Sequence, residues 1–275
     1  MTTAVRKKRV GGLSVRERNI LSDFMRAGHT TIDVQDIITK FGLNRSLANK
    51  ILSRLEKKGW LQRTKRGIYI FVPIDSITLD TIPEDPWALA MDLFKPCYIS
   101  GWSAAEYWEL TEQIFNTTIV YTVQTQRKGI QKIANITYRT HRIPEKEFFG
   151  TKRIWRNNVP VIIADLHRTV IDILDSPEFG GGGRHSLDVV RAYWESEKAD
   201  LNRLYEYARK LNRGVIFKRL GFTAEIFGKI PEPWLEKCRE HLSAGISNFD
   251  PSGPKQGKII NRWRLRINLP LEEML

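Results

Sequence analysis

The segment from residue 44 to residue 58 combines residue types that suit contacts with a nucleic acid. On a helix of about 100° per residue, its polar side chains spread over one arc of about 180°, opposite the apolar ones. The polar set is Arg45, Ser46, Asn49, Lys50, Ser53, Arg54 and Lys57. Lysine and arginine bind phosphates, and asparagine and arginine also read base edges in a major groove. We therefore predict a DNA-recognition helix, although an ordinary solvated surface helix could carry the same residues.

The residues that follow this segment favour the first interpretation. Two β-prone runs within 60–72 surround Gly67, which is typical of a hairpin. The hairpin tip is cationic because it carries Arg63, Lys65 and Arg66. A short helix, a turn, a basic helix and a hairpin in this order predict a winged helix-turn-helix, in which the hairpin contacts the flanking phosphates.

Capping residues predict where the helices of this domain begin. Ser14 and Glu17 have the spacing of a capping box and predict a first helix from Ser14. Thr30 or Thr31 is the expected cap of the second helix, and Asn44 is the expected cap of the recognition helix.

The positive charge is concentrated at the N-terminus. Residues 1–72 hold 16 Lys or Arg and 5 Asp or Glu, a net charge of +11, whereas the whole chain has +13. A basic first quarter predicts a polyanionic partner for that part of the chain. The predicted organisation is a DNA-binding domain over 1–75 with a basic arm at 1–13, a linker at 76–86, and a larger domain over 87–275.

Composition narrows the class of protein. With 275 residues and 41% hydrophobic content, the chain can form two globular domains. It has no apolar run of about 18 residues that would predict a membrane span. Cys97 and Cys238 have no metal-ligand spacing. We expect a cytoplasmic, nucleoid-associated protein without cofactor or metal.

The larger domain is predicted to be mixed α/β, so the fold class as a whole is α+β. Ser103 is the expected cap of a helix over 103–110, and Gly180–Gly183 is expected to form a loop. The expected strands cover 117–125, 131–139, 148–154 and 159–164, and the later helices cover 165–174, 187–197, 200–211 and 215–227.

One cluster in this domain could suggest enzyme chemistry. Asp165, His167, Arg168 and Asp172 crowd one helix start. Helix-spaced ion pairs between Arg168 and the two aspartates, with Asp165 as N-cap, account for it without catalysis. We predict no enzyme activity. A DNA-targeted nuclease or nucleotidyltransferase stays an alternative, as does a protein-interaction module.

Two motifs of the larger domain resemble a known family. The first is Tyr98-Ile99-Ser100 with 102–113, WSAAEYWELTEQ. The second runs from Val159-Pro160-Val161 through Asp165 and 168–172, RTVID, to Pro177 and its glycines. Following a basic winged helix, these motifs make residues 10 to 230 resemble the AbiEi antitoxins of type IV toxin–antitoxin (abortive infection) systems.

The resemblance implies a function in two parts. It implies a repressor that binds double-stranded DNA at inverted repeats upstream of its own operon. It also implies an antitoxin that counteracts a nucleotidyltransferase-like toxin, usually without a stable complex between them. Some relatives are solitary regulators without a toxin, which is a further alternative. We expect a monomer or weak dimer that pairs on DNA.

Overall fold

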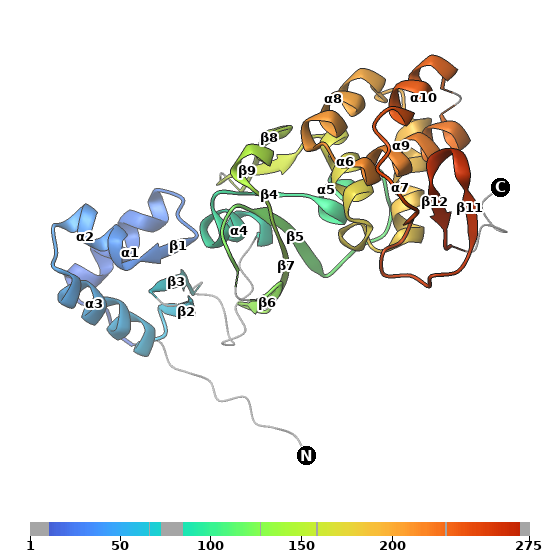
Figure 1. The fold of residues 1–275 in the computed structure, drawn as a ribbon. Coiled ribbons are helices and arrows are strands. Elements are labelled where there is room, and N and C mark those ends of the chain that lie inside the picture. The colour runs from blue at the N-terminus through green and yellow to red at the C-terminus, as the bar shows by residue number, and fades with distance from the viewer. Residues whose placement is uncertain are drawn as a thin grey trace. The chain divides into compact units, whose positions relative to one another are not determined.

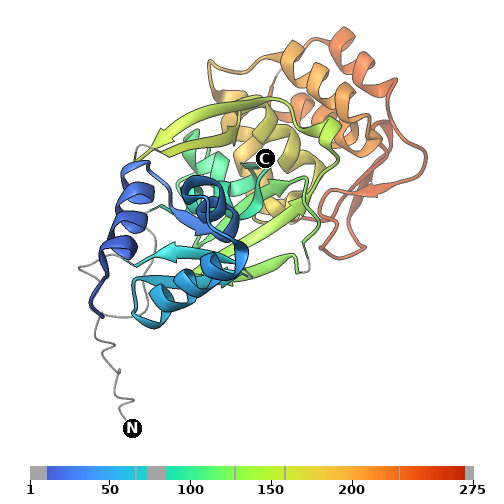
Figure 2. The same cartoon turned by 90° about the vertical axis from the view of Figure 1, so that its left-hand side faces the viewer.

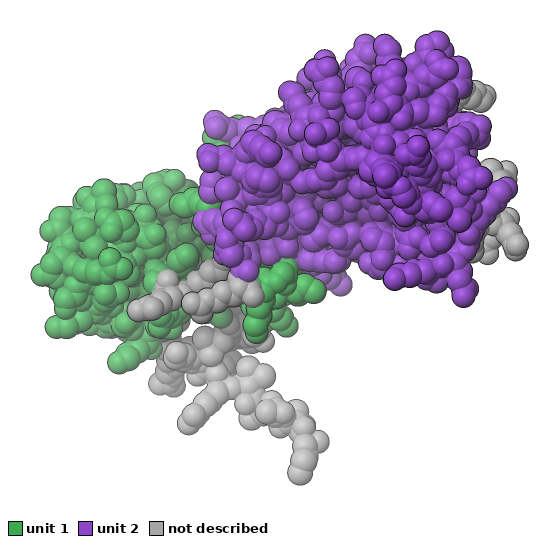
Figure 3. All heavy atoms as spheres, in the orientation of Figure 1, with its two compact units in different colours: residues 1–95, 128–138, 154–161 green, residues 96–127, 139–153, 162–275 purple. Residues whose placement is uncertain are grey.

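The computed structural model describes residues 11–65, 67–72, 85–126, 128–157, 159–228 and 230–269. The chain forms two compact units, which Figure 3 shows in green and purple. The first unit comprises residues 1–95, 128–138 and 154–161, and the second comprises 96–127, 139–153 and 162–275. Helices and strands occur in both, so the predicted mixed α/β content is confirmed.

The first unit begins with three helices beside a small sheet, which Figures 1 and 2 show from two directions. Its elements from the N-terminus to residue 95 are α1 (Val15–Arg26), β1 (Thr31–Asp33), α2 (Val34–Phe41), α3 (Arg45–Lys57), β2 (Leu61–Lys65), β3 (Ile68–Phe71) and α4 (Pro86–Phe94). The predicted arm residues 1–10 and most of the predicted linker lie outside the described residues.

The cap of α2 differs from the expectation. Asp33, rather than Thr30 or Thr31, caps the helix, and it forms a capping box with Asp36. Both threonine hydroxyls instead donate to one carboxylate oxygen of Asp92 in α4, at 2.6 and 2.9 Å. The prediction was wrong because these hydroxyls have a partner about 60 residues away, which no local pattern reveals.

The small sheet has the order β1-β3-β2, and both pairings are antiparallel. Thr31 faces Ile70 across β1 and β3, and the register of β2 shifts between Arg63 and Lys65. A single apolar core joins this sheet to the helices. Its most deeply buried members are Ile20, Ile32, Ile37, Ala48, Leu52 and Leu55.

A six-stranded sheet has the order β6-β7-β5-β4-β9-β8. Its strands are β4 (Cys97–Ile99), β5 (Thr117–Thr122), β6 (Ile130–Ile133), β7 (Ile136–Arg142), β8 (Thr151–Arg156) and β9 (Val159–Ala164). β4 pairs antiparallel with β5 and parallel with β9. The single strand expected over 131–139 is two strands, because Ala134 and Asn135 both take positive φ and turn the chain.

Helices form the rest of the second unit, together with a small sheet of order β10-β12-β11. The helices are α5 (Gly101–Tyr107), α6 (Leu166–Asp175), α7 (Gly183–Glu195), α8 (Leu201–Leu211), α9 (Gly214–Phe227) and α10 (Glu232–Arg239). The strands of the small sheet are β10 (Ser247–Asn248), β11 (Lys258–Ile260) and β12 (Leu265–Ile267), and 3-10 turns occupy Glu145–Glu147, Pro177–Phe179 and Asn261–Trp263.

Two details of these helices differ from the sequence prediction. Ser103 does not cap α5 but lies inside it, and its hydroxyl accepts from the Ile119 amide at 3.0 Å. Gly183 begins α7 rather than ending a loop. Glycine is needed there because a Cβ would lie 2.6 Å from the Cβ of Asp250.

Candidate nucleic-acid interface

Two features stabilise the helix α3: an N-terminal cap and a buried apolar face. The side chain of Asn44 accepts from the Leu47 amide at 2.9 Å and satisfies one free donor of the first turn. Ala48, Ile51, Leu52 and Leu55 are buried on one side of the helix. The chain leaves the helix at Gly59, where φ is +84°.

The opposite side of α3 faces solvent. All seven predicted residues of this helix are exposed: Arg45, Ser46, Asn49, Lys50, Ser53, Arg54 and Lys57. The last five of them line one shallow hollow of about 360 Å³. Arg45 and Ser46 belong to the preceding turn and do not line it. This face presents cations and an amide together, which is the side-chain chemistry that contacts phosphates and base edges.

Of the three cations predicted on the hairpin of β2 and β3, the structure describes the side chain of only one. Arg63 is exposed on β2. The backbone of Lys65 pairs with Ile68, but its side chain lies outside the described atoms, as does Arg66 altogether. The hairpin expected around Gly67 is confirmed as two antiparallel strands.

A buried carboxylate attaches the end of α3 to the start of α1. Glu17, only 2% exposed, accepts from Lys58 Nζ at 2.7 Å and from the Ser14 amide at 2.8 Å. Arg54 of the exposed face approaches its second oxygen at 4.0 Å. Burial by itself would raise the pKa of Glu17, but the hydrogen bonds from Lys58 and Ser14 outweigh it and lower the pKa to about 2.

The sequence revealed one half of this arrangement. The capping box of Ser14 and Glu17 is confirmed, since the Glu17 amide also donates to the Ser14 hydroxyl. The long-range bond to Lys58, 41 residues further along, carried no local signal. Glu17 is thus a residue that positions α3 and that sequence reasoning missed in this role.

The acidic cluster at the start of α6 is occupied by structural contacts. One Asp165 oxygen accepts from the Arg168 amide at 2.7 Å as the helix cap, and the other accepts from the Tyr207 hydroxyl at 2.7 Å. The expected Arg168–Asp172 ion pair is confirmed, with Nε 2.7 Å from the carboxylate. The expected Asp165–Arg168 contact is instead a bond to the backbone.

Two further side chains complete the network around Asp172. Ser100 donates to its carboxylate at 2.7 Å, and the Tyr98 hydroxyl lies 3.2 Å from it and 3.0 Å from Arg168. Burial would lower the pKa of Arg168, but the charge and hydrogen bond of Asp172, together with the nearby Tyr98 and Tyr121, outweigh burial and raise it. Tyr98, Ser100, Arg168 and Asp172 are each at most 1% exposed, so the network is part of the core and is not an accessible site.

The described residues contain no group of three or more His, Cys, Asp or Glu side chains that could hold a metal ion. Within the same residues, no helix is long and apolar enough to cross a bilayer. His167, which the sequence places in the acidic cluster of α6, forms a hydrogen bond with the Tyr193 hydroxyl at 2.9 Å.

The short helix α2 followed by the exposed basic helix α3 has the arrangement of a helix-turn-helix domain. Residues 19–72, which contain it, match the family model described as transcriptional regulator, AbiEi antitoxin, which is the family that the sequence motifs resemble. The matched stretch ends before α4.

A solved structure extends the comparison of folds to nearly the whole chain. The protein is similar to the crystal structure of the RV2827C protein from Mycobacterium tuberculosis, with a TM-score of 0.57 and 13% identity. The similarity covers 95% of this chain and 94% of that one. At this identity the likeness concerns the fold. No curated protein matches the sequence.

Proposed function

We propose that this protein is a sequence-specific regulator that binds double-stranded DNA through a winged helix-turn-helix and represses its own operon. The observation that carries the proposal is the exposed face of α3, where five polar residues line one hollow on a helix anchored by a buried carboxylate. The family match over residues 19–72 supports it. The proposed targets are paired half-sites of an inverted repeat.

Each side chain has a proposed role. Arg45, Asn49 and Arg54 read base edges in the major groove, because arginine and asparagine form bidentate contacts with guanine and adenine. The remaining residues of the face contact the backbone. The phosphate contacts are assigned to Ser46, Lys50, Ser53 and Lys57 on α3 and to Arg63, Lys65 and Arg66 on the wing.

The proposal includes an antitoxin activity for the larger domain over 87–275. In it, the protein counteracts a nucleotidyltransferase-like toxin without forming a stable complex, and it acts in the cytoplasm at the nucleoid without a cofactor. It is a monomer or weak dimer that pairs on DNA. Coexpression with the neighbouring gene tests this half: rescue of growth supports it, and growth arrest that persists contradicts it.

The test of the DNA-binding half is footprinting of the region upstream of the gene with the full-length protein. We expect protection of two related half-sites at physiological salt. Asn49→Ala and Arg54→Ala should each lower discrimination against a mutated base pair by about 1–3 kcal/mol. Asp188→Ala, on an exposed position of α7, is the matched control. Uniform, salt-labile coverage by the wild-type protein would contradict sequence-specific binding.

We also propose that the protein is not an enzyme. The carboxylates that suggested a nuclease are engaged, since Asp165 caps α6 and Asp172 is buried against Arg168. Incubation of the purified protein with DNA, nucleotides and Mg²⁺ or Mn²⁺ should give neither cleavage nor nucleotide transfer. Activity that Asp172→Asn abolishes, in a protein that remains folded, would contradict this proposal.

A further inference from the structure

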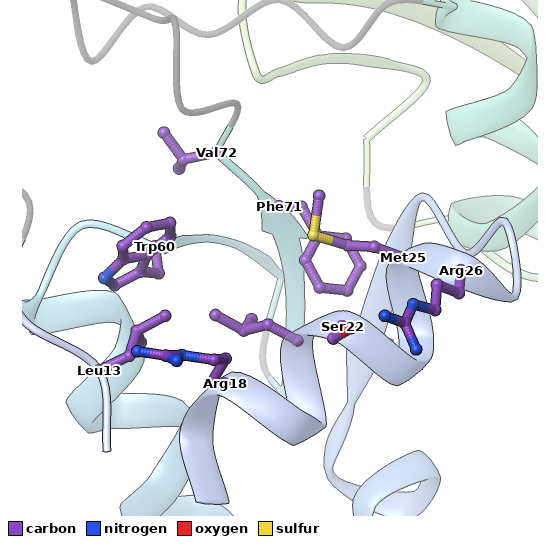
Figure 4. A pocket seen from close by; sticks show the side chains of 9 residues that line it. Leu13, Arg18, Ser22, Met25, Arg26, Trp60, Phe71 and Val72 are labelled. Atoms are coloured by element: carbon purple, nitrogen blue, oxygen red, sulfur yellow. The ribbon is translucent and has the colours of Figure 1, made fainter. Parts of the chain in front are cut away.

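A second hollow in the first unit has a different chemical character from the face of α3. It encloses about 340 Å³ between α1, the end of β3 and Trp60. Figure 4 shows Trp60 and Leu13 on one side of it and Phe71 and Met25 on the other. Met25 is 51% exposed, although its neighbours on α1 pack into the core. The apolar surface here is open to solvent.

Two cations of α1 border this apolar surface. Arg18 and Arg26 both line the hollow and are both exposed. Among the described residues, neither guanidinium has a hydrogen-bond or ion-pair partner. Their separation of eight positions corresponds to about 12 Å along the helix axis. Figure 4 shows Arg18 on the side of Leu13 and Trp60, and Arg26 near Ser22.

The wall formed by Trp60 is held in place before any ligand arrives. Its indole Nε1 donates to the Gly11 carbonyl at 2.7 Å, and its own carbonyl accepts from the Val72 amide at 3.0 Å. Its amide donates to the Leu55 carbonyl of α3, also at 3.0 Å. Since the polar atoms of Trp60 are engaged, its ring offers the hollow an apolar face.

We propose that this hollow binds a small amphipathic anion, specifically an aromatic carboxylate. Its ring lies against Trp60 and Phe71, and its carboxylate pairs with Arg18, while Arg26 adds positive potential at the other end. The reason is the complementarity of an apolar wall and unpaired guanidinium groups, which bind carboxylates in a bidentate manner. The volume lies within the range of pockets that bind small molecules, which are mostly apolar with a few polar groups.

Such a ligand would touch the joint between α3 and the hairpin, because Trp60 is bonded to Leu55 on one side and to Val72 on the other. Occupancy of the hollow therefore changes the affinity for DNA, a consequence that rests on the proposed function. Ligand binding does not depend on that function, so ligand binding and DNA affinity are measured separately.

The test compares 2-naphthoate with 2-naphthamide, its neutral analogue, on the full-length protein by calorimetry and by NMR of the tryptophan indole N–H signals. We expect 2-naphthoate to bind and to shift the Trp60 signal, assigned with Trp60→Phe. The amide should bind about tenfold more weakly, because it lacks the charge-assisted bond to Arg18. Equal binding of both compounds would overturn the charge-based part of the proposal.

Variants of exposed arginines keep the test independent of folding. Arg18→Gln should weaken 2-naphthoate by about tenfold and Arg26→Gln by less. Arg16→Gln should have no effect, because Arg16 is exposed on α1 but does not line the hollow. If 2-naphthoate does not bind, or binds all variants equally, the proposal is overturned.

Other occupants give other results. Self-association that Met25→Asp abolishes, without any binding of 2-naphthoate, would assign the hollow to a second copy of the chain. If 2-naphthoate binds and shifts Trp60 but DNA shows no specific footprint, the ligand site stands and the proposed function fails.

Discussion

The arginines of α3 and those of the second unit contrast sharply. Arg54 has a side chain that is 60% exposed, and its only ion pair among the described residues is a 4.0 Å approach to Glu17. By contrast, Arg168 is only 1% exposed and Arg219 only 3% exposed, although each carries the same positive charge as Arg54. The comparison shows that these cations face solvent in one region and are buried as part of the fold in the other.

The buried arginines have partners on several sides, although Nη1 of Arg168 and Nε of Arg219 have no hydrogen-bond partner among the described residues. Arg168 lies 4.3 Å from the ring centroid of Phe149, in addition to its bonds with Asp172 and Tyr98. Arg219 donates to the carbonyls of Leu174, Asp175 and Asn248. The net charge of a region therefore does not identify a binding surface until the burial of each cation is known.

The largest effect on stability is expected when a buried arginine loses its carboxylate partner. Asp172→Ala removes the partner of Arg168 and leaves a buried charge, which should lower the free energy of unfolding by about 3–5 kcal/mol. Denaturant unfolding measures the change. Asp188→Ala, at an exposed position of α7, should change stability by less than about 0.5 kcal/mol.

The folded fraction of Asp172→Ala should bind DNA like the wild type, because Asp172 does not belong to the face of α3. An unchanged stability would contradict the structural role that we assign to the network. Sequence-selective loss of DNA binding by the folded variant would contradict our assignment of DNA contacts to α3 and of Asp172 to the fold alone.

An intermediate effect is expected at Glu17, because it is a buried charge like those of the second unit but lies next to Arg54 of the exposed face. Its folded pKa of about 2 lies below the ordinary glutamate value of 4.5, so the unfolded chain takes up the proton more readily. Its stabilisation is therefore present above about pH 4.5 and is lost as the pH falls toward 2. We expect Glu17→Gln to remove about 1–3 kcal/mol at pH 7 and to flatten this pH dependence.

Unfolding experiments between pH 7 and pH 2 measure the effect. Glu56→Gln is the matched control, because this carboxyl of α3 has no ion pair among the described residues. A Glu17→Gln protein whose stability falls with acid as steeply as that of the wild type would show that the bond to Lys58 does not hold the pKa down.

The smallest effect is expected at the hairpin. Arg63→Ala should weaken binding about equally for all DNA sequences and reduce the slope of log K against log salt by about 1, because a phosphate contact releases counterions. Lys237→Ala, exposed on α10, is the control. A change of sequence preference in Arg63→Ala would show instead that the hairpin reads bases.

Elements with strong local signals could be predicted from the sequence. The helix α3 follows from its Asn44 cap and its two-sided pattern, and α6 follows from its Asp165 cap. The exposed face of α3 could be named residue by residue for the same reason. Its contact with DNA stays a prediction.

Elements that depend on distant partners could not be predicted. The strand β1 has three residues and exists because it pairs with β3. The helix α10 and the strand β10 went unpredicted because both are short, whereas β12 lies within a strand-like run over 263–269. Likewise, only the fold brings Tyr98 and Ser100 to Asp172.

The bonds from Thr30 and Thr31 to Asp92 have a practical consequence for dividing the protein. A fragment that ends at residue 75 would lack α4, and the two hydroxyls would be left to water. Asp92 is the acceptor that the two threonines share, and Thr31 lies in β1, which pairs with β3 of the hairpin. A self-contained DNA-binding fragment should therefore extend at least through Phe94, the last residue of α4.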